Sequence, residues 1–83
     1  MIKFTPEGWG DYASWSDGRK SLRRINRLIG EATRDPAVGA GKPERLKGNL
    51  TGHWSRRIDQ EHRLVYTVDP HGDLVIIQAR HHY

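Results

Sequence analysis

The chain has 83 residues, of which 14 are basic and 10 are acidic, so its formal net charge at neutral pH is +4. A chain this short buries only a thin core, and the sequence therefore predicts a single domain spanning residues 1–83. The absence of cysteine excludes disulfides and thiolate metal sites, and it fits a reducing compartment. No signal peptide or bilayer-spanning apolar run is found, so we expect a cytoplasmic protein without membrane contact. The basic excess fits a polyanionic partner such as nucleic acid.

The N-terminal segment is predicted to form a short strand, residues 2–4, followed by a helix from Pro6 to about Trp15. Proline is tolerated in a first helical turn because its missing N–H would be unpaired there anyway. The helical spacing comes from three side chains, Trp9, Tyr12 and Ala13. Gly8 and Gly10 each weaken this helix by about 1 kcal/mol relative to alanine, so aromatic packing must hold it in place.

A second helix is predicted from an N-cap at Asp17 to about Arg34, and Pro36 ends it. Its core-facing side chains form one apolar stripe: Leu22, Ile25, Leu28, Ile29 and Ala32. Its other faces are basic: Arg19, Lys20, Arg23, Arg24 and Arg27. A loop containing two glycines, residues 37–42, follows the helix.

Three strands are predicted in the C-terminal half, at residues 54–58, 62–68 and 73–81. The connector at residues 69–72 has good turn chemistry, whereas the connector at residues 59–61 lacks glycine. Together with the helices, these strands predict a small α+β domain. Its two N-terminal helices pack on one face of a twisted antiparallel β-sheet.

The loop lengths predict how the strands pair. The loop at residues 59–61 places Arg57 opposite Arg63, and the following loop pairs Val68 with Asp73. Because strand side chains alternate, one face should pack under the helices: Trp54, Ile58, Leu64, Tyr66, Val75, Ile77 and Ala79. The other face should hold basic and polar side chains with three apolar ones: Arg57, Arg63, Gln78, Arg80 and His82, with Val65, Leu74 and Ile76.

The opposed arginine pair is the first sign of a binding site. Directly opposed cations repel each other, which is destabilising unless an anion lies between them. Guanidinium groups bind phosphate well because they offer paired donors and stay charged. The alternative is that both arginines are solvated or pair with acids such as Asp59 and Glu61. Arg80 and His82 join the same face, which favours an anion site. Arg56 does not fit the pattern, because alternation places this cation on the core face, from which it reaches solvent only near an edge.

Two further residues supply acid–base chemistry. His82 titrates near neutral pH and can donate a proton, and Glu44 lies among cations that keep it ionised and able to act as a base. The ordinary alternatives are an inert terminal histidine and a surface glutamate neutralised by its neighbours. RNA brings its own nucleophile, the 2′-hydroxyl, so a metal-free ribonuclease needs a base, cations and an acid. Glu44, Arg63 with Arg57, and His82 fit these roles. His81 and His82 point to opposite sides of a strand, so they predict no metal site.

Longer motifs give a resemblance that covers essentially the whole chain. They are Lys42-Pro43-Glu44-x-Leu46-Lys47, Asn49-Leu50-x-Gly52-x-Trp54-Ser55-Arg56-Arg57-Ile58, His62-Arg63-Leu64-Val65-Tyr66, the early Glu7-x-Trp9-x-Asp11-Tyr12-x-x-Trp15 and the ending His82-Tyr83. Together they closely resemble the YoeB family of toxins, which belongs to the RelE-like group of microbial ribonuclease folds. The resemblance implies a toxin of a toxin–antitoxin pair that enters the ribosomal A site and cleaves the mRNA codon there.

The resemblance also implies roles for individual residues. It makes Glu44 the general base, Arg63 the phosphate stabiliser and His82 the general acid, with Tyr83 helping to place the substrate. Three basic residues are expected to bind RNA: Lys47 and Arg57 by the resemblance, and Arg80 by its place on the basic face. No metal or cofactor is implied. His81 departs from the family pattern and could compete with His82 as the proton donor.

A protein partner is implied as well, an antitoxin of YefM type whose acidic C-terminal segment folds onto the toxin. The apolar residues of the basic face, Val65, Leu74 and Ile76, would suit such a partner. They would equally suit a second copy of the chain in a homodimer.

Two classes of function therefore stay open. The first is a ribosome-dependent endoribonuclease, and the second is a non-catalytic protein that blocks the ribosomal A site by occupying it. Both predict a basic face and steep salt dependence, but only the enzyme needs Glu44 and His82. A small DNA-binding protein has little support, because the basic helix lacks a helix-turn-helix partner.

Overall fold

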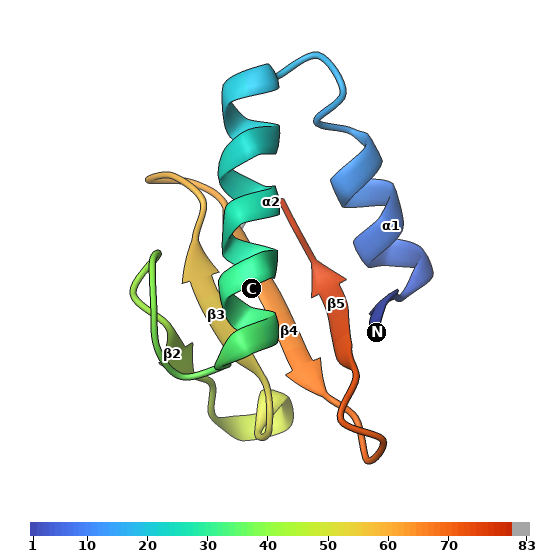
Figure 1. Cartoon of the computed structure of the whole chain (residues 1–83), viewed down its shortest axis with the longest axis vertical. Coiled ribbons are helices and arrows are strands. Elements are labelled where there is room, and N and C mark those ends of the chain that lie inside the picture. Colours follow the sequence, from blue (N-terminus) through green and yellow to red (C-terminus); the bar gives the residue numbers. More distant parts are fainter. Residues whose placement is uncertain (81–83) are drawn as a thin grey trace.

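Five strands form one mixed sheet in the computed structural model, which describes residues 1–80 (Figure 1). The strands are β1 (Ile2–Phe4), β2 (Glu44–Arg45), β3 (Trp54–Arg57), β4 (Arg63–Val68) and β5 (Leu74–Gln78). They lie in the order β1-β5-β4-β3-β2. The predicted antiparallel pairing is confirmed for β3, β4 and β5, and β2, which was expected to be a loop, also pairs antiparallel with β3. The prediction is corrected at one edge, where β1 runs parallel to β5.

Two helices, α1 (Pro6–Ala13) and α2 (Arg19–Arg34), and one 3₁₀ turn, η1 (Gly48–Leu50), complete the described fold. The side chain of Thr5 caps α1 by accepting a hydrogen bond from the Gly8 N–H at 3.0 Å. The predicted cap of α2 at Asp17 is wrong, because the N-cap is Gly18, which has no side chain to bond the first turn. In Figure 1, α2 lies across β3 and β4, and α1 lies on the side of β5. Within residues 1–80 no helix is both long and apolar enough to span a membrane.

The core lies between the helices and one face of the sheet. Its buried members are Trp15, Ile25, Leu28, Ile29, Ala32, Ile58, Leu64, Tyr66, Leu74, Ile76 and Ala79. The apolar stripe predicted for the second helix is confirmed, with Leu22 partly buried at its margin. Each fully buried aliphatic side chain stabilises the fold by about 1.5–3 kcal/mol relative to exposure, so α2 is held chiefly by this stripe.

The β3–β4 hairpin has the predicted register. Trp54 lies opposite Tyr66, and Arg57 lies opposite Arg63. With so short a connector between the strands, this register is the one that keeps the apolar side chains of β3 and β4 on the side of the helices. The opposed arginines are therefore a feature of the fold.

The β4–β5 hairpin has a different register from the predicted one. Val68 pairs with Leu74 rather than with Asp73, a shift of one residue that reverses which side chains face the helices. The side chains buried in the core are Leu74 and Ile76, and the expected core positions Val75 and Ile77 are wrong. Leu74 and Ile76 therefore face the helices, and the prediction that they lie on the basic face is wrong. Val65 is on the expected face, but it is only 1% exposed.

A β-bulge in β5 then restores the predicted alternation. Val65 pairs with Gln78 while the next residue, Tyr66, pairs with Ile76, so Ile77 is an extra residue in β5. A bulge of this kind bends a strand and shifts its side chains by one position. Beyond the bulge Gln78 shares a face with Val65, as the sequence predicted.

Helix α1 packs closely against β5 because residue 8 is glycine. The N–H of Thr5 donates to the carbonyl oxygen of Ile76 at 3.0 Å. A β-carbon on Gly8 would collide with that same carbonyl oxygen. At Gly10, by contrast, a β-carbon would have no atom within 4 Å. Packing of α1 on β5 therefore requires glycine at position 8. From the sequence alone, Gly8 counts only as a residue that weakens the helix.

Candidate active site

Strands β2, β3 and β4 bring three of the predicted site residues together on the sheet face opposite the helices. We call this the open face, and its residues are Glu44, Ser55, Arg57, Arg63, Val65 and Gln78. They share a face because Glu44 pairs with Ser55, Ser55 with Val65, Arg57 with Arg63 and Val65 with Gln78. The three strands therefore place a carboxylate and two guanidinium groups close together.

Glu44 and Arg63 form the centre of this arrangement. Oε2 of Glu44 lies 3.8 Å from Nη1 of Arg63, and the two side chains are 61% and 16% exposed. The same Nη1 donates a hydrogen bond to the Ser55 hydroxyl oxygen at 3.3 Å, and Ser55 is fully buried. The carboxylate is thus open to a solvent-borne ligand, while its cationic partner is held within the sheet.

Arg57 places a second guanidinium on the open face. Its backbone is fixed on both sides, because its N–H donates to the Gly41 carbonyl at 2.7 Å and its own carbonyl accepts from Nη2 of Arg24 at 3.1 Å. Its side chain is exposed and lies on the strand position opposite Arg63. Two such neighbours suit a bound anion, which removes their mutual repulsion.

Arg80 packs against the corner between α1 and α2, whereas the sequence placed its side chain on the basic face. Its guanidinium carbon lies 4.1 Å from the centroid of the Trp15 ring, and its Nη1 donates to the Ser14 hydroxyl at 2.9 Å. The indole N–H of Trp15 in turn donates to the Ala79 carbonyl at 2.7 Å. These contacts hold residues 79 and 80, directly after β5, against Trp15 and Ser14.

Lys47, His82 and Tyr83 complete the set of predicted site residues. Lys47 is exposed and directly precedes η1. His82 and Tyr83, the predicted general acid and its neighbour, lie outside the described residues 1–80.

Arg56 forms a buried cluster that sequence reasoning did not foresee. It is fully buried rather than reaching solvent at an edge. Its Nε donates to the Tyr66 hydroxyl at 2.8 Å, its Nη2 to the carbonyls of Asp35 and Val38 at 2.7 and 2.8 Å, and its Nη1 to the Ala40 carbonyl at 3.1 Å. Over residues 1–80, no buried side-chain nitrogen or oxygen lacks a hydrogen-bond partner. These acceptors replace the water that a buried cation loses, so its burial is tolerated.

Ser55 is the second residue that sequence reasoning missed. The sequence did contain a signal for Ser55, since the predicted register of β3 and β4 places its small hydroxyl on the same face as the two arginines. A hydroxyl between basic positions on one face is suited to orient a guanidinium.

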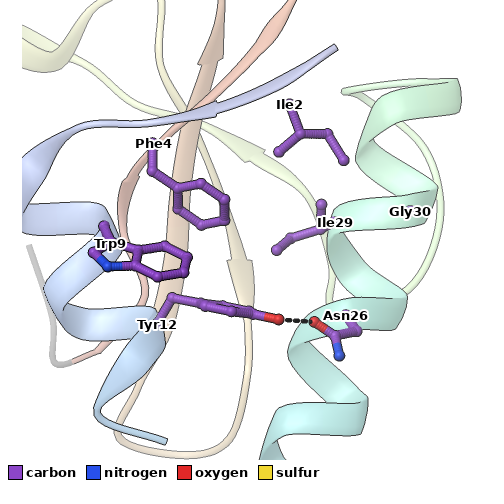
Figure 2. A pocket seen from close by; sticks show the side chains of 7 residues that line it. All are labelled: Ile2, Phe4, Trp9, Tyr12, Asn26, Ile29 and Gly30. Atoms are coloured by element: carbon purple, nitrogen blue, oxygen red, sulfur yellow. Dashed lines mark hydrogen bonds between the residues drawn. The ribbon is translucent and has the colours of Figure 1, made fainter.

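A separate apolar groove of about 480 Å³ lies between β1, α1 and α2. Figure 2 shows the rings of Phe4, Trp9 and Tyr12 clustered beside it, with the Tyr12 hydroxyl donating to Oδ1 of Asn26 at 2.7 Å. Its lining is Ile2, Phe4, Trp9, Tyr12, Asn26, Ile29 and Gly30, without a charged side chain. Nor, among residues 1–80, is any group of three His, Asp or Glu side chains placed to hold a metal ion. The predicted site residues Glu44, Arg57 and Arg63 lie instead on the open face.

Comparison with known proteins identifies relatives along the whole chain. A family model described as YoeB-like toxin of bacterial type II toxin–antitoxin system matches residues 4–83. Toxin YoeB of Streptomyces coelicolor is 60% identical over 84 residues, covering 99% of this chain and 98% of that protein. Among solved structures, a YoeB/ParE toxin from Agrobacterium tumefaciens superposes with a TM-score of 0.94 at 45% identity, covering 100% of this chain and 99% of the other.

Two further solved structures come from Staphylococcus aureus. A YoeB–YefM complex contains a chain that superposes with a TM-score of 0.89 at 44% identity, covering 100% of this chain and 97% of that one. A YoeB dimer superposes with a TM-score of 0.87 at 44% identity, covering 99% and 95%.

Proposed function

Because the chain belongs to the family of YoeB-like toxins of bacterial type II toxin–antitoxin systems, we propose that it is a ribosome-dependent endoribonuclease. In this proposal residues 1–83 form one toxin domain that works in the cytoplasm, enters the ribosomal A site and cleaves the mRNA there. The observation that supports it is the pair formed by the exposed Glu44 and the more buried Arg63 on the open face. An acid–base ribonuclease needs such a pair, whereas a protein that acts by occupying the A site needs no base.

The proposed reaction uses the 2′-hydroxyl of the RNA as its nucleophile. Glu44 accepts the proton of that hydroxyl while its oxygen attacks the neighbouring phosphorus. Arg63, with Arg57 opposite it, stabilises the negative charge that develops on the phosphate oxygens. The bond from phosphorus to the 5′-oxygen then breaks, and His82 donates a proton to that oxygen, leaving a 2′,3′-cyclic phosphate. No metal or cofactor takes part in this scheme.

We propose that Lys47 and Arg57 bind the RNA or ribosomal backbone and that Tyr83 helps to place the substrate. The expected RNA contact of Arg80 is not proposed, because its guanidinium packs on the Trp15 ring and bonds the Ser14 hydroxyl. The Glu44 carboxylate is 61% exposed and so is accessible to RNA from solvent, and Nη1 of the less exposed Arg63 lies 3.8 Å from it.

The protein partners are inferred from the relatives. A relative from Staphylococcus aureus is found in a complex with YefM and also as a dimer. We therefore propose a YefM-type antitoxin as the partner of this chain, and a homodimer as its form without the antitoxin. The net charge of +4 suits an acidic antitoxin segment as well as RNA.

Primer-extension mapping of an mRNA on programmed ribosomes tests the proposal. Wild type is compared with Glu44→Gln and His82→Gln, and with two control variants at exposed positions, Glu7→Gln and His71→Gln. We expect wild type and both controls to cut within the A-site codon. Loss of the base or the acid should reduce the cleavage rate by on the order of 10²-fold.

Two results would count against the proposal. Blocked translation without any cut would assign the function to occupancy of the A site. Unchanged cleavage by His82→Gln would remove this histidine as the general acid and would direct attention to His81.

A further inference from the structure

The loop between α2 and β2, residues 35–41, is held from two sides by charged side chains. We propose that Arg56 and Glu31 are positioning residues for Glu44, because they fix this loop and so the strand that presents the Glu44 carboxylate to Arg63. The inference rests on the proposed function, which makes Glu44 the catalytic base.

Arg56 holds the loop from the sheet side. Three of its four hydrogen bonds go to loop carbonyls, those of Asp35, Val38 and Ala40, at 2.7–3.1 Å. The fourth goes to the hydroxyl of Tyr66, which itself donates to the Pro36 carbonyl at 2.6 Å. One buried guanidinium thus binds the loop along its length, with charge-assisted hydrogen bonds.

Glu31 holds the same loop from the helix side. Its Oε1 accepts the Ala40 N–H at 2.8 Å, and its Oε2 accepts Nε of Arg27 at 2.9 Å. The Ala40 N–H and then Arg27 lower the pKa of the Glu31 carboxyl, so it is ionised at neutral pH. Ala40 is therefore bound at its N–H by an anion from α2 and at its carbonyl by a cation from β3.

Glycine makes this approach of charged groups to the loop backbone possible. Gly39 and Gly41 have positive φ angles of 124° and 86°, a region that other residues rarely adopt. A β-carbon at Gly39 would lie 2.5 Å from Oε1 of Glu31 and 2.8 Å from Nη1 of Arg56. Glycine at this position thus leaves room for the side chains of Glu31 and Arg56, and their hydrogen bonds in turn fix the conformation of the loop.

The loop leads directly to Glu44. Its last residue, Gly41, accepts the N–H of Arg57 at 2.7 Å, and only Lys42 and Pro43 separate it from Glu44. Strand β2 has two residues and lies at the edge of the sheet, so its own ladder holds it weakly. Its place relative to Arg63 therefore depends on where the loop delivers the chain.

Single-turnover cleavage on programmed ribosomes tests the inference in a double-mutant cycle. Glu31→Gln and Arg56→Lys are each measured with Glu44 present and in a Glu44→Gln background. With Glu44 present we expect a loss of about tenfold or more, since a misplaced catalytic group is costly. In the Glu44→Gln background we expect no further loss, because there is no base left to position. Affinity for ribosomes carrying an uncleavable mRNA, with a 2′-deoxynucleotide at the cut site, should stay unchanged.

Asp69→Asn is the matched control for Glu31→Gln. The Asp69 carboxylate also accepts backbone N–H groups, those of His71 and Asp73 at 2.9 and 3.0 Å, but it does not contact the loop. Equal losses in both backgrounds, or a loss matched by Asp69→Asn, would show that Arg56 and Glu31 act on stability alone and would overturn the inference. If Arg56→Lys fails to fold, Glu31→Gln decides the question, because Glu31 is partly exposed and glutamine keeps an acceptor.

Amide hydrogen exchange gives a readout that needs no RNA. The Arg57 N–H bonds to Gly41 and the Leu46 N–H bonds to His53, so both report whether β2 stays in place. We expect Glu31→Gln to speed their exchange and to leave the amides of β4 unchanged. If wild type does not cleave, or if Glu44→Gln leaves cleavage unchanged, the proposed function fails. Unchanged exchange at Arg57 and Leu46 would overturn the positioning role itself.

Discussion

Arg57 and Arg63 lie directly opposite each other on β3 and β4, on the face that the helices leave uncovered. Opposed like charges on neighbouring strands destabilise a sheet by about 0.2–1 kcal/mol. A nearby carboxylate, that of Glu44, offsets part of this repulsion from 3.8 Å on the side of Arg63. The pair thus suits the binding of an anion at some expense of stability.

Replacing Arg57 should therefore stabilise the protein. We expect Arg57→Gln to raise the free energy of unfolding by about 0.2–1 kcal/mol at low salt, and the gain to shrink as salt screens the charges. Urea denaturation at two salt concentrations measures both effects. Added inorganic phosphate should stabilise wild type more than the variant. A variant that is less stable than wild type at low salt would contradict this view of the pair.

Removing the hydroxyl of Ser55 should impair the orientation of Arg63. We expect Ser55→Ala to lower the cleavage rate several-fold, up to about tenfold, which corresponds to about 1.4 kcal/mol. Single-turnover kinetics measure it. The matched control is Thr67→Val on the neighbouring strand β4, which removes a hydroxyl from the same face of the sheet, one that donates to the Gly52 carbonyl at 2.8 Å. If the two variants lose equal activity, the hydrogen bond to Arg63 has no special part.

The two glycines of α1 should respond in opposite ways to alanine. Gly10→Ala meets no atom within 4 Å and should stabilise the protein by about 0.5–1 kcal/mol through helix propensity. Gly8→Ala places its β-carbon against the Ile76 carbonyl, so it should destabilise by roughly 2–4 kcal/mol. Thermal unfolding of both variants gives the comparison. A Gly8→Ala protein as stable as wild type would show that α1 can move away from β5 at little cost.

The acid sensitivity of the fold should depend on Lys3. Its Nζ lies 2.9 Å from Asp69 Oδ2 and 3.1 Å from Asp73 Oδ2. The Lys3 hydrogen bond is the main cause that lowers the pKa of each of these carboxyls. A lowered pKa adds stability above the ordinary value, about pH 4 for aspartate, and that stability is lost as pH falls through the lowered value.

The same contacts act in the opposite direction at high pH. Hydrogen bonds to Asp69 and then Asp73 raise the pKa of Lys3, so its contribution is present below its ordinary value and is lost as pH rises through the raised one. We expect Lys3→Met to flatten the dependence of the free energy of unfolding on pH below about pH 4 and above about pH 10.4. Urea denaturation at a series of pH values measures the free energy of unfolding in both the acid and the alkaline range. Parallel pH curves for Lys3→Met and wild type would show that Lys3 does not shift the pKa values of Asp69 and Asp73.

The sequence predicted the parts of the sheet that loop length determines. A three-residue connector fixed the β3–β4 register, and with it the opposed arginines and the core positions of Trp54 and Tyr66. It did not predict β5, because Val68 pairs with Leu74 rather than with Asp73, and the bulge at Ile77 restores the predicted alternation only from Gln78 onward. The parallel pairing of β1 was also missed, since a three-residue strand has too little pattern to indicate its partner.

One part of the candidate site could likewise be predicted from the sequence, and another part could not. Alternation alone placed Arg57 and Arg63 on one face, and β2 then places Glu44 beside them in the structure. The network around Arg56 was beyond sequence reasoning, because its acceptors are backbone carbonyls of a loop whose path no residue pattern shows. The side chain of Arg80 differs for a related reason, since its cation–π contact with Trp15 joins residues distant in sequence.

The parallel pairing of β1 with β5 joins residues 2–4 to residues 74–76. Contacts between such distant segments slow folding, because a long loop must close before they can form. During translation β1 has no partner until β5 has also been made, whereas α2 and the β3–β4 hairpin consist of local contacts. A newly made chain should thus form α2 and the central hairpin first, and the sheet is completed only after β5 has been synthesised.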